Sequence, residues 1–92
     1  MAGNAVLEKI KAGAAVIDVR TPDEFADGHY PNARNIPLRE IKHRAGEIGP
    51  KEKPVVLYCL SGARSASAAK ELRSLGFTDV LNAGGLGDMP PS

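Results

Sequence analysis

The sequence predicts an α/β fold in which a parallel sheet carries helices on both faces. Apolar positions with helical spacing alternate with short β-rich runs along all 92 residues, an order typical of parallel sheets. The chain has no low-complexity linker and no internal repeat, and its length suits one small domain. We therefore expect a single domain over residues 1–92, with ligands bound at the carboxyl ends of the strands.

The elements of the N-terminal half follow from periodicity and end signals. Apolar residues at helical spacing predict a helix over about residues 4–12 that Gly13 ends. The apolar run 14–19 predicts a buried strand. Residues 21–24, Thr-Pro-Asp-Glu, combine an N-cap threonine, a proline at the first helical position and a capping box. A short helix should therefore follow and end near Gly28.

The remaining elements are predicted from the same signals. In chain order they are a very short strand at 35–36 between two prolines, an amphipathic helix over 38–48, a strand over 54–58, a helix around 68–75 that Gly76 ends, and a last strand at 79–81. We expect no further regular structure from the double glycine at 84–85 onward.

Charge and composition argue against several classes of function. Twelve Lys and Arg against 11 Asp and Glu leave a net charge of 12 − 11 = +1 without a basic stripe, which argues against binding to nucleic acid or an anionic membrane. No apolar run approaches the length of about 18 residues that a membrane helix needs. The first residues lack the pattern of a signal peptide. We expect a cytoplasmic protein as the chain stands, and a periplasmic one if a signal peptide has been removed.

The single cysteine lies where a buried strand meets a helix. Cys59 follows the strand 54–58, and the residues after it are Leu60, Ser61, Gly62, Ala63, Arg64 and Ser65. A cysteine after an apolar strand is more often a small buried residue without chemistry. Here, however, the backbone N–H groups of a helix start favour a thiolate, and no carboxylate occurs between residues 54 and 70. We expect Cys59 to be a nucleophile and the loop 60–65 to bind an anionic substrate.

Other titratable residues do not suggest a metal or cofactor site. One cysteine and two separated histidines have no metal-ligand spacing, so we expect neither a metal nor a cofactor.

Several motifs, taken together and in order, resemble the rhodanese homology domain. They are Asp18-Val19-Arg20, Glu24-Phe25, Gly28-His29, Pro31-Asn32-Ala33, Asn35-Ile36-Pro37, the strand ending in Cys59 with Ser61-Gly62 and Arg64-Ser65, Gly76-Phe77 and Gly84-Gly85. Within the family, residues 82–86 and the short length look most like the single-domain thiosulfate sulfurtransferases, including the periplasmic phage-shock type. The resemblance implies a rhodanese-like parallel sheet of about five short strands, and a cysteine that alternates between thiolate and persulfide.

The resemblance also implies an activity and roles for residues. Cys59 would take sulfane sulfur from thiosulfate or another persulfide donor and pass it to a thiol, a thioredoxin-like protein or cyanide. The backbone amides of residues 60–65, together with Arg64, would hold the sulfonate. In this family Asp18, Arg20 and Glu24 look like a supporting network of ion pairs near the loop. His29 precedes Tyr30-Pro31 in a turn that the family uses structurally, so the resemblance favours a structural hydrogen bond for His29 over catalysis. The sequence indicates no oligomeric state.

Two alternatives remain beside this interpretation. A non-enzymatic module that carries persulfide sulfur or binds a partner would use the same cysteine. A cysteine phosphatase or arsenate reductase has its arginine six residues after the cysteine, whereas Arg64 comes five after Cys59, and no acid pairs with the loop. The chain also lacks the tryptophan that family members often carry after the double glycine, so the rim of the pocket there is expected to be open or completed by a partner.

Overall fold

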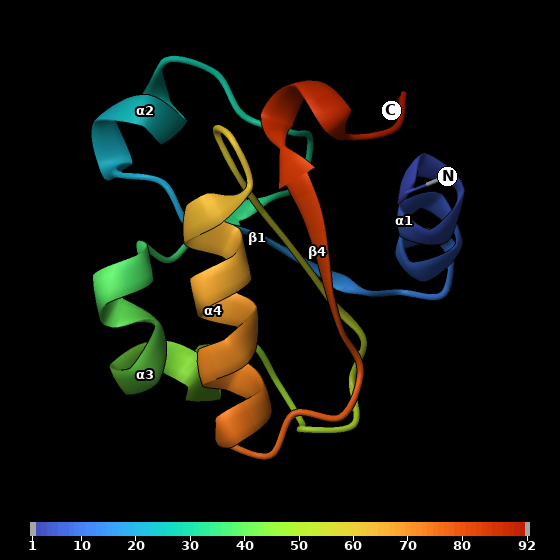
Figure 1. Ribbon diagram of the computed structural model, residues 1–92, viewed down its shortest axis with the longest axis vertical. Coiled ribbons are helices and arrows are strands. Elements are labelled where there is room, and N and C mark those ends of the chain that lie inside the picture. Colours follow the sequence, from blue (N-terminus) through green and yellow to red (C-terminus); the bar gives the residue numbers. More distant parts are fainter. Residues whose placement is uncertain (1, 92) are drawn as a thin grey trace.

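A four-stranded parallel sheet forms the centre of the protein (Figure 1). The computed structural model describes residues 2–91. The sheet order is β2-β1-β3-β4, with β1 at Ala15–Asp18, β2 at Arg34–Asn35, β3 at Val55–Cys59 and β4 at Val80–Gly85. The helices are α1 (Ala2–Lys11), α2 (Pro22–Ala26), α3 (Ile41–Arg44) and α4 (Ala63–Ser74). Short 3-10 turns occupy η1 (Leu38–Glu40), η2 (Ala45–Glu47) and η3 (Leu86–Asp88).

The predicted fold class is confirmed, with one strand fewer than the resemblance implied. The described residues form four strands instead of about five. The segment before β1 is helical, so it does not extend the edge of the sheet. All strand pairs are parallel, as the alternation of strands and helices predicted.

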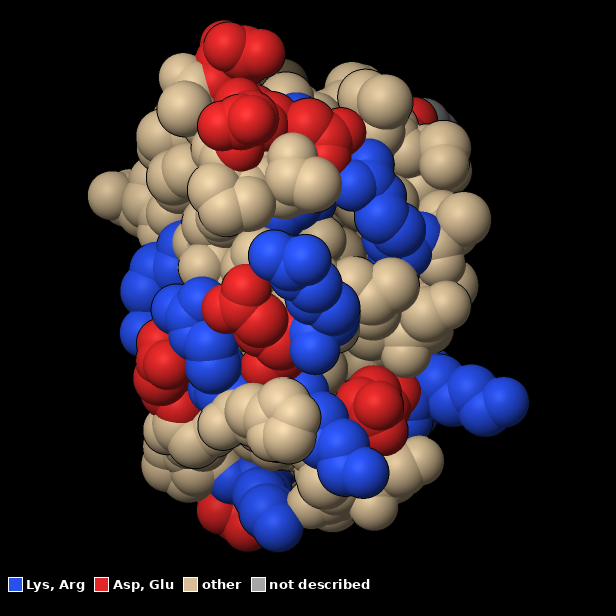
Figure 2. Space-filling view, turned by 90° about the vertical axis from the view of Figure 1, so that its left-hand side faces the viewer, with Lys and Arg blue, Asp and Glu red and all other residues tan. Residues whose placement is uncertain are grey.

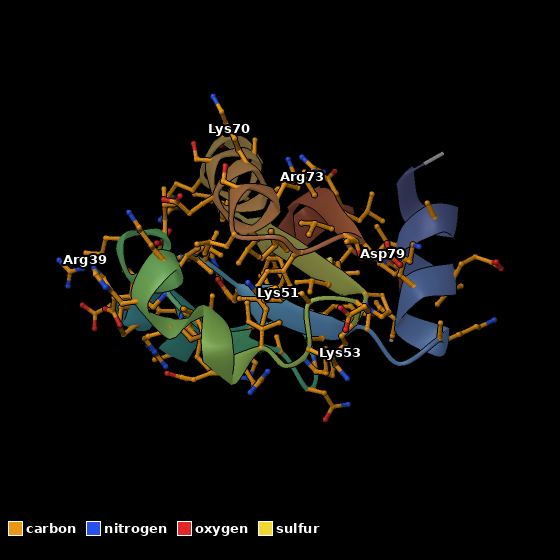
Figure 3. All side chains as sticks on the ribbon, turned by 90° about the horizontal axis from the view of Figure 1, so that it is seen from below. Arg39, Lys51, Lys53, Lys70, Arg73 and Asp79 are labelled. Atoms are coloured by element: carbon orange, nitrogen blue, oxygen red, sulfur yellow. The ribbon has the colours of Figure 1, made fainter. Side chains whose placement is uncertain are left out.

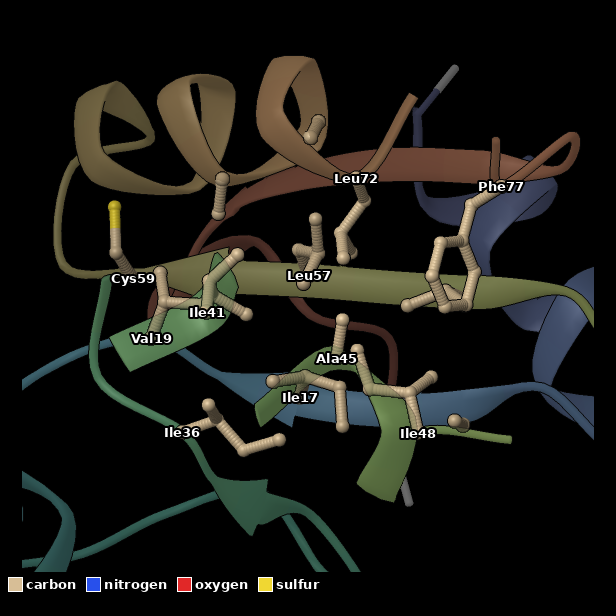
Figure 4. Close-up of a cluster of buried hydrophobic side chains, with 14 residues drawn as sticks. Ile17, Val19, Ile36, Ile41, Ala45, Ile48, Leu57, Cys59, Leu72 and Phe77 are labelled. Atoms are coloured by element: carbon tan, nitrogen blue, oxygen red, sulfur yellow. The ribbon is translucent and has the colours of Figure 1, made fainter. Parts of the chain in front are cut away.

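Side chains of the central strands alternate between two apolar clusters, because successive residues of a strand point to opposite faces. Ile17, Leu57 and Cys59 belong to the cluster that α3 and α4 cover (Figure 4). Val16 and Val56 belong to the cluster on the face of α1. Cys59 therefore lies on the α4 side of the sheet, at the end of a continuous apolar core.

Two local end signals of the sequence are confirmed. The Thr21 hydroxyl accepts the Glu24 N–H at 3.3 Å, while the Glu24 carboxylate accepts the Thr21 N–H at 3.0 Å, which is the capping box of α2. At the end of α4, the Gly76 N–H donates to the Arg73 carbonyl and the Phe77 N–H to the Leu72 carbonyl, both at 3.0 Å. This pair of bonds is a Schellman motif, as the position of Gly76 predicted.

Two predicted elements differ from the structure. The expected helix over 38–48 is divided into η1, α3 and η2, although Ile41, Ala45 and Ile48 still face the core. Bonds over three residues, such as the Ile48 N–H to the Ala45 carbonyl at 3.0 Å, replace a continuous helical pattern.

The end of the chain is also more regular than expected. Strand β4 continues to Gly85 and η3 follows it, so the prediction of no regular structure after residue 84 was wrong. Pairing with β3 accounts for the difference, since Leu57 pairs with Asn82 and Cys59 with Gly85 across a local irregularity of the ladder. Tertiary pairing thus outweighs the low strand propensity of Asn and Gly.

The strands point toward the end of the molecule that carries α2 and η3 (Figure 1). Figure 3 looks at the opposite end, where Lys51, Lys53 and Asp79 lie near the amino ends of β3 and β4. Asp79 forms an ion pair with Lys9 of α1 there, with 2.8 Å between the charged groups. Within residues 2–91, no helix has both the length and the apolar character needed to cross a membrane.

Candidate active site

Cys59 is the last residue of β3, and its side chain lies beside the first turn of α4 (Figure 4). Gly62 is the N-cap of α4 and has a left-handed backbone with φ of 101°. This conformation turns the chain sharply enough for the Gly62 N–H to point back and donate to the Cys59 Sγ at 2.9 Å. The Ser65 hydroxyl lies 3.4 Å from the same sulfur.

The Cys59 sulfur is buried, yet hydrogen-bond donors face it on one side. Burial raises the pKa of the Cys59 thiol, and hydrogen bonds from the Ser65 hydroxyl and from the backbone of Ser65, Gly62 and Ser61 lower it. The hydrogen bonds outweigh burial, so the pKa lies below the ordinary value. Cys59 is thus a member of the apolar core and also a thiol with a lowered pKa. From the sequence, burial and reactivity were two competing interpretations of this residue.

The loop after Cys59 packs directly on the end of β4. A Cβ atom on Gly62 would lie 3.3 Å from the Gly84 Cα, and one on Gly85 would overlap the Leu60 carbonyl. Only a residue without a side chain permits this approach at position 85. The double glycine therefore belongs to the site, because it lets the cysteine loop lie against the neighbouring strand.

Exposure differs strongly among the loop residues predicted to bind substrate. Leu60, Ser61 and Ala63 are exposed, and among the residues that the structure describes Leu60 is the one exposed large apolar side chain, at 64%. Ser65 is buried in the first turn of α4. The loop therefore presents an apolar side chain to solvent directly beside the buried thiol.

Arg64 does not act as an isolated positive charge. Its guanidinium donates two hydrogen bonds to the Glu24 carboxylate of α2, at 2.7 and 2.9 Å. The Arg64 side chain lowers the pKa of Glu24 from 4.5 to about 2, with further hydrogen bonds from Thr21. The sequence between residues 54 and 70 holds no carboxylate, which predicts a positive field around the loop. The structure corrects this prediction, because Glu24 reaches Arg64 from 40 residues earlier in the chain.

The supporting network at the end of β1 is a buried ion pair. Asp18 is fully buried, and the Arg20 guanidinium donates to it at 2.7 Å and to the Gly28 carbonyl at 2.7 Å. The Asn35 amide donates to the Asp18 and Arg20 carbonyls at 3.0 and 2.9 Å. These bonds hold the end of β1 against β2 beside the cysteine loop.

His29 makes local contacts of a structural kind. Its Nδ1 lies 3.0 Å from the Phe25 carbonyl oxygen, and its ring stacks on the Phe25 ring with 3.8 Å between centroids. Both contacts stay within the turn after α2, which fits the structural role that the sequence favoured. Among residues 2–91, no three His, Cys, Asp or Glu side chains come together as candidate metal ligands.

Asn82 of β4 is a site residue that the sequence analysis did not assign. Its side-chain oxygen lies 2.6 Å from the Ser65 hydroxyl and accepts the Gly84 N–H at 2.9 Å, while its NH₂ group donates to the Gly62 carbonyl at 3.2 Å. The one signal in the sequence is a polar residue two positions before the double glycine. That signal becomes meaningful only when β4 is known to pair with β3.

A cavity of about 400 Å³ opens beside the loop. Its walls come from the segments after β1 and β2, from α2, from η1 and from the start of α4, and they consist of Val19, Thr21, Pro22, Pro37, Leu38, Arg39 and Arg64. Figure 2 shows the side of the molecule to the left of Figure 1: acidic side chains gather near the top, where α2 lies, and both signs of charge are interspersed below.

Comparison with known proteins gives consistent matches. The family model described as "Rhodanese-like domain" matches residues 3–86. The protein named YqhL of Bacillus subtilis is 49% identical over 78 residues, which are 82% of this chain and 61% of that protein. Thiosulfate sulfurtransferase PspE of Escherichia coli is 43% identical over 74 residues, 79% of this chain and 71% of the relative.

Solved structures lead to the same group. The structure titled "rhodanese with anions from E. coli" superimposes with a TM-score of 0.79 at 42% identity and covers 85% of this chain and 95% of its own. The human single-domain sulfurtransferase TSTD1 gives a TM-score of 0.78 at 29% identity and covers 89% and 85%, respectively.

Proposed function

Since the chain belongs to the rhodanese-like domain family, we propose that it is a thiosulfate sulfurtransferase in which Cys59 carries the transferred sulfur as a persulfide. The observation that carries this proposal is the Gly62 N–H at 2.9 Å from the Cys59 Sγ, at the start of α4. A backbone donor and a helix N-terminus both favour a thiolate, which is the nucleophilic form of cysteine.

The first half-reaction needs only a thiolate and a place for an anion. The Cys59 thiolate attacks the outer sulfur of thiosulfate, a sulfur–sulfur bond to Cys59 forms, and the bond to the sulfonate sulfur breaks. Sulfite leaves with the electron pair of that bond. Because sulfite is stable as an anion, no general acid has to protonate the leaving group, and the balance requires no oxidant.

The second half-reaction restores the enzyme. An acceptor thiolate attacks the outer sulfur of the Cys59 persulfide, the persulfide bond breaks, and the Cys59 thiolate re-forms. The acceptor leaves as a persulfide, or as thiocyanate when it is cyanide. We propose a thiol or a thioredoxin-like protein as the acceptor, since the exposed Leu60 beside Cys59 offers an apolar contact.

The loop binds the sulfonate in this proposal. The backbone N–H groups of residues 60–65 supply donors around the sulfur, as in an oxyanion hole. Arg64 adds positive charge at the rim while it remains bonded to Glu24. Because Sγ is buried, the exposed part of the loop, Leu60 and Ser61, has to shift to admit the donor.

A carrier of persulfide sulfur is the competing function, since it would use the same Cys59 persulfide. A carrier receives its sulfur from another protein and turns over thiosulfate slowly. The exposed Leu60 suits a protein donor as well as a protein acceptor.

Intact-mass measurement after addition of thiosulfate tests the proposal. We expect one additional sulfur atom on the wild-type protein, with release of one sulfite, and neither on Cys59→Ser. An unmodified wild type would contradict sulfur transfer through Cys59.

Comparing sulfur donors then separates the enzyme from the carrier. The rate of persulfide formation is measured with thiosulfate and with a persulfidated donor protein. A thiosulfate rate that sustains turnover with cyanide supports the enzyme, whereas transfer from the protein donor alone supports the carrier.

A further inference from the structure

The Ser65 hydroxyl has one proton and four acceptors within reach. Its oxygen lies 2.6 Å from Asn82 Oδ1, 3.1 Å from the Gly62 carbonyl, 3.3 Å from the Gly84 carbonyl and 3.4 Å from the Cys59 Sγ. A hydroxyl donates one strong hydrogen bond at a time. The shortest distance assigns that bond to Asn82 in the arrangement of this structure.

The orientation of the Asn82 amide is determined by two backbone groups of opposite polarity. The Gly84 N–H can only donate, so the atom 2.9 Å from it is the side-chain oxygen. The Gly62 carbonyl can only accept, so the atom 3.2 Å from it is the nitrogen. The amide oxygen must therefore face Ser65, and Ser65 must be the donor of the 2.6 Å bond.

The protonation state of Cys59 changes what the Ser65 hydroxyl can do. A thiol can donate its own proton to the Ser65 oxygen while Ser65 donates to Asn82. A thiolate can only accept, and the Ser65 O–H becomes its second close donor after the Gly62 N–H. Asn82 Oδ1 still accepts the Gly84 N–H after Ser65 turns away, so no buried polar atom is left without a partner.

We propose that Asn82 is a positioning residue: its side-chain oxygen accepts the hydrogen bond of the Ser65 hydroxyl while Cys59 is a thiol, and this bond is given up when the thiolate forms, so that the hydroxyl donates to Sγ instead. This inference deepens the proposed function, on which it rests, because the thiolate is the form that attacks the sulfur donor. The Ser65 hydroxyl thereby becomes a donor to the buried thiolate, while the other hydrogen bonds between the cysteine loop and β4 stay in place.

Charged groups around the cluster come from several elements. Arg64 of α4 and its partner Glu24 of α2 lie on one side, and the buried Asp18–Arg20 pair ends β1. Asp88 of η3 accepts the Gly85 N–H at 2.8 Å. A double-mutant cycle on Ser65 and Asn82 leaves all of these charged groups in place. It therefore isolates the effect on the ionisation of Cys59 that Asn82 exerts through Ser65.

The test is the pH midpoint of Cys59 ionisation, followed by the ultraviolet absorbance of the thiolate with Cys59→Ser as the baseline. Cys59 is the only cysteine, so the signal has one source. Ser65→Ala should raise the midpoint by about one to two units, because the thiolate loses a donor to a charged group. Asn82→Ala should lower it by about half a unit to one unit, because ionisation no longer breaks the Ser65–Asn82 bond.

The double variant decides whether Asn82 acts through Ser65. With Ser65 already replaced by Ala, Asn82→Ala should leave the midpoint unchanged. A raised or unchanged midpoint in the Asn82→Ala single variant, or an equal shift in both backgrounds, overturns the proposal. Asn35→Ala is the matched control, since the Asn35 amide also bonds two backbone groups, the Asp18 and Arg20 carbonyls, and both lie outside the cysteine loop; it should keep the wild-type midpoint.

A second variant covers the case in which Asn82→Ala does not fold. Asn82→Asp keeps an acceptor toward Ser65 and Gly84 but holds the Ser65 proton more strongly and adds a negative charge near Sγ. Its midpoint should rise by about one unit or more, and an unchanged or lower midpoint overturns the proposal. These titrations use no thiosulfate, so they stand or fail independently of the sulfur-transfer experiment.

Discussion

Glu24→Gln removes the carboxylate that pairs with Arg64 while sparing the local structure of α2. A glutamine at this position can still accept the Thr21 N–H, which is the capping-box bond that the Glu24 side chain makes at 3.0 Å. The substitution therefore isolates the ion pair between α2 and the cysteine loop. We expect the variant to fold and to be less stable than the wild type at neutral pH.

The geometry sets the size of this effect. The Arg64 guanidinium and the Glu24 carboxylate share two hydrogen bonds of 2.7 and 2.9 Å, an arrangement that is stronger than a single hydrogen bond. Both side chains are nevertheless about one third exposed, at 35% and 30%, so water screens the attraction. We expect a loss of about 1 kcal/mol in the free energy of unfolding, near the upper end for pairs at the surface. For a domain of this size, that loss lowers Tm by about 4–8 °C.

The pH dependence provides the sharper test. Hydrogen bonds from Arg64, the largest cause, and from Thr21 lower the pKa of Glu24 from 4.5 to about 2 in the folded protein. A lowered folded pKa stabilises the protein above the unfolded pKa, and this stabilisation disappears as the pH falls toward the folded value. The stability gap between wild type and Glu24→Gln should therefore be full at about pH 7 and shrink steadily between about pH 4.5 and pH 2.

Urea unfolding at several pH values measures this gap. Glu52→Gln is the matched control, because it removes the same charge at an exposed position before β3. The control should leave the free energy of unfolding near the wild-type value. A gap of constant size from neutral to acidic pH would refute the reasoning, since the loss would then come from packing or capping instead of charge.

Two further substitutions test the close packing at Gly85 and the buried ion pair at Asp18. Gly85→Ala should reduce the rate of sulfur transfer at least about tenfold and destabilise the fold by about 1–3 kcal/mol, because the new Cβ overlaps the Leu60 carbonyl. Thermal unfolding of this variant is compared with that of Gly46→Ala, where nothing lies within 4 Å of the added atom; Gly46→Ala should stay within about 0.5 kcal/mol of the wild type, and equal losses would contradict the argument. Asp18→Asn should cost about 3–5 kcal/mol, since Arg20 is only 5% exposed and would keep a buried charge without its partner; a loss below about 1 kcal/mol would be incompatible with that account.

Features that depend on neighbours along the chain could be predicted well. The capping box at Thr21 and the Schellman motif at Gly76 involve residues within six positions of one another. The position of Cys59 between a buried strand and a helix start also follows from local pattern. In each case the interacting residues are close in sequence, so the covalent chain keeps them near one another independently of the rest of the fold.

Features that depend on strand pairing could not be predicted in the same way. The length of β4 is set by its ladder with β3, since the residues of its second half, Asn82 to Gly85, are poor strand formers. The division of the segment 38–48 into three short helical pieces likewise follows from how it packs against the core. Periodicity identified which of its residues are buried without determining the type of helix.

The sequence by itself determined the fold class and the position of Cys59 and its loop between a buried strand and a helix start, because these depend on hydrophobic spacing and on residues adjacent to Cys59. Only the tertiary structure decided how the charge and the protons of the site are arranged. Glu24 reaches Arg64 from 40 residues away and Asn82 reaches Ser65 from 17 residues away. Hydrogen bonds act over a few ångströms in space, so partners separated by that much chain are brought together by the order of the strands.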